Sequence, residues 1–299
     1  MLKGEASQAW GFPTNHTPTC FTWGRCGLLA YSAGPVLSIT SIRTEGFIIL
    51  RSWSPKGYNI TSLAWADGNI TSTRAPPILL VGFSNGEFVI YDIHGYKQIY
   101  SGSVRGGSVS AAIWSPIDMD TFFIGTSNGT LVKYRRKTKF EVVVSTKVGH
   151  SINLIRHNQL PNGSLLVMSK CGEGKLLYED TLEHELNIDL GEYMNSLEDL
   201  RFIDFYPGSI HWAVIILMDS LYLFSMESNT WINMLTLDNI FTAFFISHKP
   251  YTILVGSYDT IYVIGTEEKE WHIQMAFPFN LSSPTGPSYC IAIERMNDF

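Results

Sequence analysis

Charged residues are scarce in this chain. Asp, Glu, Lys and Arg make up 16% of its 299 residues, against roughly 25% in a typical soluble domain. The charge that is present is mainly acidic, with a formal net charge of −6 at pH 7, which argues against nucleic acid as the main ligand. Aromatic residues reach 13%. Scarce charge combined with many aromatics predicts a large buried core and a surface that binds partners.

Long apolar runs and closely spaced cysteines are also missing. Residues 1–6 lack the apolar segment of a signal peptide, and residues 212–217 are too few to cross a bilayer. We therefore expect a cytoplasmic protein, which could also associate peripherally with Golgi or endosomal membranes. We expect its four cysteines to be buried, reduced thiols: Cys20, Cys26, Cys171 and Cys290. Six Asn-X-Ser/Thr sequons favour the opposite, secreted interpretation; they begin at Asn15, Asn59, Asn69, Asn128, Asn162 and Asn280.

The motifs of common catalytic and metal sites do not occur. The chain has no Cys-x-x-Cys, no His-x-x-x-His, no Asp-rich calcium loop and no Gly-rich phosphate loop. The acidic run 179–185 is expected to be an exposed outer hairpin, with His184 solvated. A basic cluster, 133–139, is interpreted as a solvated turn, with an acidic peptide or a phosphoinositide headgroup as alternative ligands. We predict no catalytic residue, no metal and no cofactor.

Two segments of the chain have nearly the same sequence pattern. Residues 79–91 (LLVGFSNGEFVIY) and 122–134 (FFIGTSNGTLVKY) each read as an apolar strand, a Ser-Asn-Gly turn and an alternating strand that ends in an aromatic. Asn-Gly supplies the positive φ of a tight turn between twisted strands. Three such hairpins follow a tryptophan, at Trp23, Trp65 and Trp114.

The repeat continues along the chain in weaker copies. A period of 40–50 residues with this content is typical of a β-propeller built from four-stranded blades. We predict one all-β domain, 1–299, with units near 19–59, 60–107, 108–150, 151–196, 197–239 and 240–287. A partial seventh unit is expected at 288–299. Whether N-terminal residues complete that seventh blade, or the chain is a fragment of something longer, stays open at this point.

These units resemble the repeat of the WD-repeat propeller family. That repeat carries Gly-His near its start, an aspartate in a tight turn and Trp-Asp at the end of its third strand. Matching fragments here are Gly149-His150, Asp219, Asp259 and Tyr91-Asp92. The resemblance implies that Gly149 and His150 are structural, and that the blades without the full set depend on apolar packing.

A narrower resemblance concerns the first unit. The segment 23–31 (WGRCGLLAY), with the second tryptophan at 65, looks like the start of the N-terminal propeller in the large two-propeller WD-repeat scaffold of trans-Golgi vesicle tethering. A similar opening occurs in activators of the mitotic ubiquitin ligase. The first resemblance implies a role in vesicle trafficking.

We therefore expect a non-catalytic protein-interaction scaffold that binds other proteins, either peptide segments or complex subunits. Propellers of this kind bind through the loops that enter each blade. Trp53, Tyr58 and Arg105 stand in those loops and are of types enriched at binding hot spots, although Trp53 could equally pack on the adjacent blade. The alternatives are a propeller hydrolase or lyase with a central-funnel site, a substrate-recruiting subunit of a ubiquitin ligase, and an extracellular recognition propeller that uses the sequons.

Overall fold

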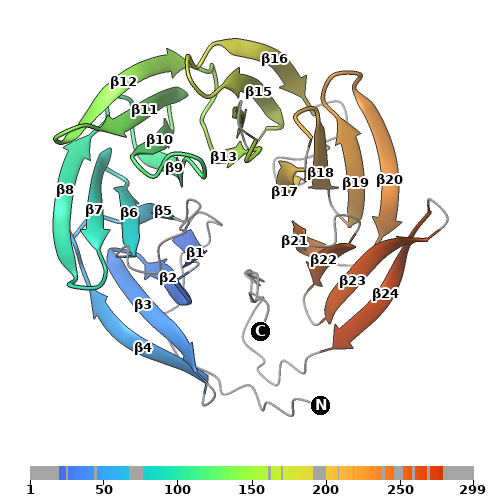
Figure 1. Ribbon diagram of the computed structural model, residues 1–299, viewed down its shortest axis with the longest axis horizontal. Coiled ribbons are helices and arrows are strands. Elements are labelled where there is room, and N and C mark those ends of the chain that lie inside the picture. Colours follow the sequence, from blue (N-terminus) through green and yellow to red (C-terminus); the bar gives the residue numbers. More distant parts are fainter. Residues whose placement is uncertain are drawn as a thin grey trace. The chain divides into compact units, whose positions relative to one another are not determined.

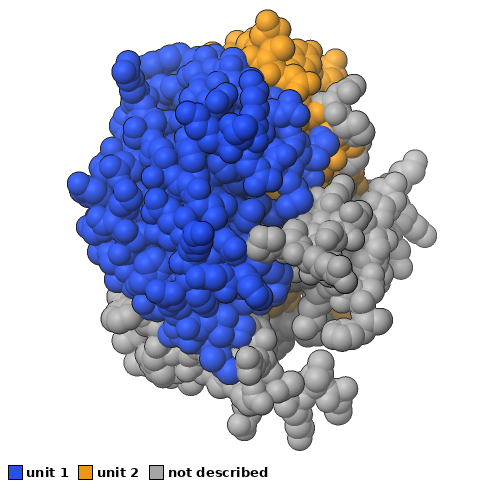
Figure 2. Space-filling model, turned by 60° about the vertical axis from the view of Figure 1, so that its left-hand side comes forward, with its two compact units in different colours: residues 1–155 blue, residues 156–299 orange. Residues whose placement is uncertain are grey.

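A computed structural model describes residues 20–24, 26–43, 46–66, 77–160, 163–169, 171–190, 200–207, 209–217, 219–237, 240–245, 252–257, 260–267 and 270–278. The described residues form 24 β-strands in six four-stranded antiparallel sheets and contain no α-helix. The chain divides into two compact units, 1–155 and 156–299 (Figure 2). Within each sheet the strands follow in chain order, which is the blade arrangement of a β-propeller.

The first unit holds three blades (Figure 1). Their strands are β1 (Phe21–Gly24), β2 (Leu28–Ala33), β3 (Val36–Arg43) and β4 (Gly46–Trp53); β5 (Ile60–Trp65), β6 (Ile78–Phe83), β7 (Glu87–Asp92) and β8 (Lys97–Ser103); β9 (Val109–Trp114), β10 (Thr121–Thr126), β11 (Thr130–Arg136) and β12 (Phe140–Lys147). The first strands of successive blades, β1, β5 and β9, contact one another.

The second unit contains the other three blades. Their strands are β13 (Leu154–His157), β14 (Ser164–Met168), β15 (Glu173–Tyr178) and β16 (His184–Asp189); β17 (Leu200–Phe205), β18 (Trp212–Leu217), β19 (Ser220–Ser225) and β20 (Thr230–Thr236); β21 (Ile240–Phe245), β22 (Thr252–Ser257), β23 (Thr260–Glu267) and β24 (Glu270–Pro278). The division between the units falls inside β13. Both the expected seventh unit, 288–299, and residues 1–17 lie outside the described residues.

The core lies between the blades. Second strands such as β10 are buried at every position, as expected of a strand covered on both faces. Between the second and third blades, Phe88, Trp114, Phe122 and Tyr134 pack together, and the Phe122 and Tyr134 rings stack with their centroids 4.9 Å apart. Burial among these rings raises the pKa of Tyr134 to about 12.

Every outermost strand carries a one-residue bulge where it pairs with the third strand. The extra residues are Leu50, Ile99, Val143, Glu185, Met234 and Gln274. A bulge bends the strand and increases its twist, which makes an exposed edge a poorer template for another strand. This matters here because apolar residues such as Ile49 and Val142, 40% and 56% exposed, stand on these outer strands.

A second bulge lies near the start of several first strands and connects neighbouring blades. The extra residues of these bulges are Thr61 in β5 and Ser110 in β9. The Thr61 hydroxyl donates to the carbonyl of Val109 in the next blade at 2.5 Å, and the Ser110 hydroxyl donates in the same way to Ile152. The bulge therefore positions a hydroxyl that clamps one blade to the next.

The opposite end of the same strands carries a matching clamp. The Trp65 indole N–H donates to the carbonyl of Thr22 in the preceding blade, and the Trp114 indole N–H donates to Ala64, each at 3.1 Å. The repeated tryptophans thus have a shared role that goes beyond apolar burial. In the first unit, the seam between the second and third blades is closed at both ends by side-chain-to-backbone hydrogen bonds.

Candidate functional site

The candidate site is built from connections at one end of the blades in the first unit. Each connection into a blade lies beside a turn between the second and third strands, and backbone hydrogen bonds join the two. Ser84 N donates to Asn59 O at 2.9 Å, Val104 N to Gly86 O at 2.9 Å, and Val148 N to Gly129 O at 2.8 Å. We call residues 54–59, 84–87, 104–108, 127–129 and 147–152 together the loop face.

The loop face contains the Ser-Asn-Gly turns that the sequence repeats. Gly86 and Gly129 close these turns with φ of 84° and 81°, the left-handed region that glycine adopts without strain. Asn128 fixes its own turn, because its Oδ1 accepts the hydroxyls of Thr126 and Thr130 at 2.8 and 3.0 Å. The turns present exposed Ser and Asn side chains on a backbone that is hydrogen-bonded to the neighbouring connection.

The loop that carries Arg105 is held on both sides. Val104 is buried and its N–H is bonded to Gly86, whereas the Gly106 carbonyl accepts from Asn128 N at 3.3 Å. Gly106 and Gly107 have φ of 131° and 91°, and a Cβ at Gly106 would stand 2.5 Å from the Asn128 side chain. The close approach of the two loops therefore depends on glycine, and it leaves Arg105 exposed on an ordered segment.

The three residues predicted as binding anchors fall in two places. Tyr58 is 49% exposed in the loop that follows β4, and Arg105 is exposed in the loop that follows β8, so both belong to the loop face. Trp53 instead packs edge-to-face on Tyr91 and Tyr96 of the next blade, with ring centroids 5.6 and 5.8 Å apart. Trp53 therefore packs on the adjacent blade, which the sequence analysis gave as the alternative to a binding role for this residue.

Two further features surround Trp53. The Arg51 guanidinium lies over the rings of Trp53 and Tyr96, at 5.4 and 4.7 Å from their centroids. Burial raises the pKa of Tyr91 above its ordinary value, while the side-chain hydrogen bond with Trp53 and the charge of Lys56 act in the opposite direction. Trp53 therefore belongs to a cation–aromatic cluster in the seam between the first and second blades.

Most side chains of the basic cluster 133–139 take part in ion pairs or cation–aromatic contacts. Lys133 is buried within β11 and lies over the Phe123 ring. Arg135 and Arg136 pair with Asp118 and Asp120, at 3.4 and 2.7 Å. The interpretation as one solvated turn was wrong for Lys133, and the paired arginines do not form an open anion site.

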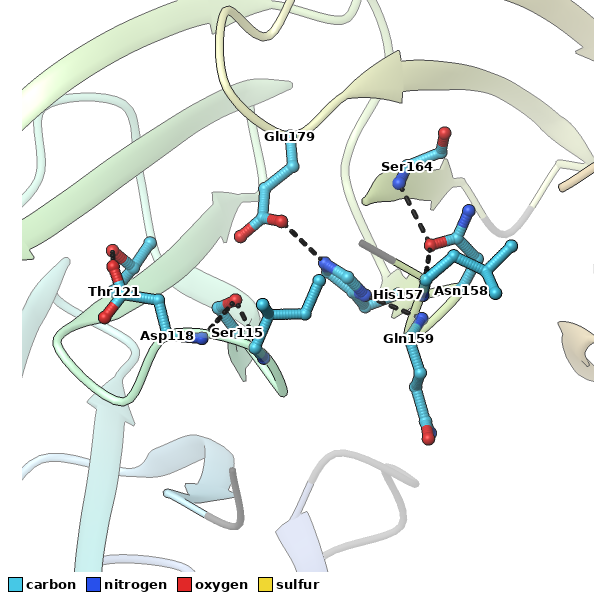
Figure 3. Close-up of polar contacts among 10 residues, drawn as sticks. Ser115, Asp118, Thr121, His157, Asn158, Gln159, Ser164 and Glu179 are labelled. Carbon is cyan, nitrogen blue, oxygen red and sulfur yellow. Dashed lines mark hydrogen bonds and ion pairs between the residues drawn. The ribbon is translucent and has the colours of Figure 1, made fainter. Parts of the chain in front are cut away.

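A buried hydrogen bond between a histidine and a carboxylate lies in the fourth blade (Figure 3). His157 Nε2 is 2.9 Å from Glu179 Oε2, and the side chains are 2% and 11% exposed. Because Nδ1 accepts the N–H of Gln159 at 2.8 Å, the proton lies on Nε2, which donates to the carboxylate. Glu179 belongs to the acidic run expected to be exposed, so that expectation was wrong at this residue. His184 in the same run is exposed, as expected.

His157 occupies the position that tryptophan fills in earlier blades. The residue after it, Asn158, donates its N–H to Ser164 O, as Ser115 does to Thr121 O after Trp114. Ser115 and Asn158 also cap their own loops, since Ser115 Oγ accepts from Asp118 N and Asn158 Oδ1 accepts from Ser164 N (Figure 3). The His157–Glu179 pair is thus part of blade architecture, enclosed rather than open to a substrate.

Two participants of the loop face were not singled out from sequence. Lys147 is exposed at the end of β12 and donates to the Asn128 carbonyl at 3.3 Å. Lys56 pairs with Glu87 at 3.4 Å. Nothing local marks these lysines, because their placement beside the turns comes from the pairing of strands that are distant in sequence.

Other expectations concern the cysteines and membrane spans. The cysteines were expected to be buried as well as reduced: Cys20 is buried, but Cys26 is exposed and Cys171 is half-buried, and Cys290 lies outside the described residues. His150, expected to be a structural residue of its blade, is exposed. In the part of the chain that the structure describes, no helix has the length and apolar character that a membrane span requires.

Comparison with known proteins identifies the fold but not a close relative. No family model matches the sequence, and no curated protein matches it. By contrast, 1575 chains of solved structures match the fold. One is a chain in the crystal structure of a mitotic checkpoint complex, with a TM-score of 0.68 and 11% sequence identity over 90% of this chain and 83% of that chain. The fold is a β-propeller of four-stranded blades, and at this identity the likeness concerns the fold alone.

Proposed function

We propose that the chain is a non-catalytic protein-interaction scaffold of the WD-repeat type, and that it binds partner proteins through the loop face of its first unit. The observation that carries this proposal is the presentation of Tyr58 and Arg105. Both side chains are exposed, and the loop of Arg105 is fixed by hydrogen bonds on either side of it. Tyrosine and arginine on preordered loops give contact area and charge at a low entropic cost of binding.

The fold supports an interaction role over catalysis. WD-repeat propellers generally act as platforms for other proteins, and the matched chain comes from a multiprotein complex. The enclosed His157–Glu179 pair gives no support to the hydrolase or lyase alternative, because the His157 side chain is only 2% exposed.

We further propose that the scaffold acts in vesicle trafficking or tethering. It would work in the cytoplasm and associate peripherally with Golgi or endosomal membranes. The support is the resemblance of segment 23–31 to the trans-Golgi tethering scaffold. The substrate-recruiting subunit of a ubiquitin ligase is the alternative, and its support is the similar opening of the first unit in activators of the mitotic ubiquitin ligase.

Affinity purification of the tagged chain from its own cells, followed by mass spectrometry, tests the function. The variants Tyr58→Ala and Arg105→Ala are compared with Lys97→Ala, which removes an exposed cation from the start of β8, away from the loop face. We expect tethering or coat components to be recovered with the parent and Lys97→Ala chains and lost with the other two. If folded protein recovers no partner, or recovers the same partners with all variants, the proposal is wrong.

A further inference from the structure

The loop face carries positive charge on an acidic protein. Its exposed cations are Lys56, Arg105 and Lys147, and Glu87 is the one carboxylate within its residues, all of which the structure describes. The chain as a whole has a net charge of −6. The sign of the loop face is therefore opposite to that of the protein.

Two of the three cations have no carboxylate partner among the described residues. Lys56 pairs with Glu87, but the Lys147 ammonium contacts the neutral Asn128 carbonyl, 3.3 Å away. Arg105 forms no hydrogen bond or ion pair with a described residue. Elsewhere in the first unit, Arg135, Arg136 and Lys137 each have a carboxylate partner. Lys97 and Lys139 are also exposed without a carboxylate partner among the described residues, so what distinguishes the loop face is that it places two such cations beside one turn.

The two available cations flank one turn. Arg105 precedes Gly106, whose carbonyl is bonded to Asn128 N, while Lys147 is bonded to the carbonyl of the same Asn128. The turn between them exposes Ser127 and Asn128. The Asn128 Oδ1 is occupied by two threonine hydroxyls, so its amide nitrogen is the group left to donate outward. The arrangement offers an arginine, an ammonium and an amide donor around a fixed backbone.

We infer that this part of the loop face, centred on Arg105, Asn128 and Lys147, binds an acidic peptide segment of a partner protein. A guanidinium binds a carboxylate through two parallel hydrogen bonds, and a nearby ammonium adds a second charge contact. The occupant is a short carboxylate-bearing segment, because two cations suit a few carboxylates, whereas the long phosphate backbone of a nucleic acid would extend over the acidic remainder of the protein. The inference rests on the proposed function and specifies its ligand.

The test uses the full chain and a fluorescein-labelled peptide of alternating Glu and Ser residues, with a Gln–Ser peptide of the same length as control. Fluorescence anisotropy gives the affinity at low and high salt. We expect the Glu–Ser peptide to bind, and Arg105→Gln and Lys147→Gln each to weaken it by about tenfold, as for loss of one charge-assisted contact. Lys97→Gln is the matched control for net charge and should leave the affinity unchanged. High salt should weaken binding to the parent chain.

Several outcomes would overturn the inference. Equal binding of the Glu–Ser and Gln–Ser peptides would do so, as would equal effects of Arg105→Gln and Lys97→Gln. Binding only when the serines are phosphorylated would replace the carboxylate segment with a phosphopeptide. If the Glu–Ser peptide fails while loop-face substitutions still abolish capture of cellular partners, the acidic ligand is wrong and the scaffold function stands. If cellular capture is also insensitive to those substitutions, the proposed function fails with it.

Discussion

Substitution at the hydroxyl clamps would measure how strongly neighbouring blades hold each other. Thr61→Val keeps the branched shape of the side chain but removes the hydroxyl that donates to Val109 O. Val109 is fully buried, so water cannot replace the lost donor. A net hydrogen bond contributes about 0.5 to 1.5 kcal/mol, and a buried carbonyl left with fewer partners raises the cost, so we expect a loss of about 1 to 2 kcal/mol in unfolding free energy. Ser110→Ala removes the equivalent clamp to Ile152 and should cost a similar amount.

The other end of the same seam provides an independent comparison. Trp114→Phe removes the indole N–H that donates to Ala64 O and leaves space in a buried site, which we expect to cost about 2 to 4 kcal/mol. Val109 and Trp114 are the two ends of β9, separated by roughly 17 Å of strand at about 3.3 Å per residue. Sites this far apart should behave additively, so the Thr61→Val/Trp114→Phe chain should lose about 3 to 6 kcal/mol.

Urea denaturation followed by far-ultraviolet circular dichroism measures these losses. The midpoint should fall while the denaturant slope stays constant, which separates a stability change from a change in the unfolded chain. Ser101→Ala, which removes an exposed hydroxyl from β8, is the matched control for Ser110→Ala and should change little. Equal midpoints for Ser110→Ala and Ser101→Ala would refute the clamp as a source of stability.

Two further predictions concern buried titratable groups. His157→Phe should cost about 1.5 to 3 kcal/mol by removing the hydrogen bond that the buried Glu179 carboxylate accepts from His157, and His157→Phe/Glu179→Leu should regain most of this in the same denaturation assay; a double variant as unstable as the sum of the two single variants would contradict it. The pKa of Tyr134 is raised to about 12, whereas in the unfolded chain it is about 10. Between these values only the unfolded chain releases the proton, so unfolding free energy should fall by about 2 to 3 kcal/mol from pH 10 to 12. Relative to the parent, Tyr134→Phe should flatten that decline in alkaline denaturation, and an unchanged slope would refute the assignment.

The repeat could be predicted from sequence because its signals are local. In residues 79–91 and 122–134, continuous apolar runs become β6 and β10, and the Asn-Gly pairs become turns with glycine at positive φ. Turn chemistry and strand burial act within a dozen residues, so a linear pattern is enough to indicate them. The same reasoning correctly placed Tyr58 and Arg105 in connecting loops.

The contacts between blades could not be predicted in this way. The spacing of Trp65 and Trp114 is visible in the sequence, but the acceptor of each indole lies in the preceding blade. His157 breaks the aromatic pattern, and Glu179 stands among charged residues that read as a solvated loop, so only three-dimensional proximity reveals their pair. That no described carboxylate pairs with Arg105 is likewise a consequence of its three-dimensional surroundings.

The hydroxyl clamps lie next to the loops of the candidate binding surface and hold the ends of those loops in place. Ser110 is the second residue of β9, the strand that follows the loop carrying Arg105, and its hydroxyl fixes the start of β9 to the next blade. Thr61 stands in the same relation to the loop that carries Tyr58. A loop whose ends are fixed loses little further conformational freedom when a partner binds, and the contact energy of an arginine or tyrosine is then available for affinity. The repeat thus gives the chain stability through side-chain-to-backbone bonds, while the loop residues that those bonds hold in place are left to differ from blade to blade.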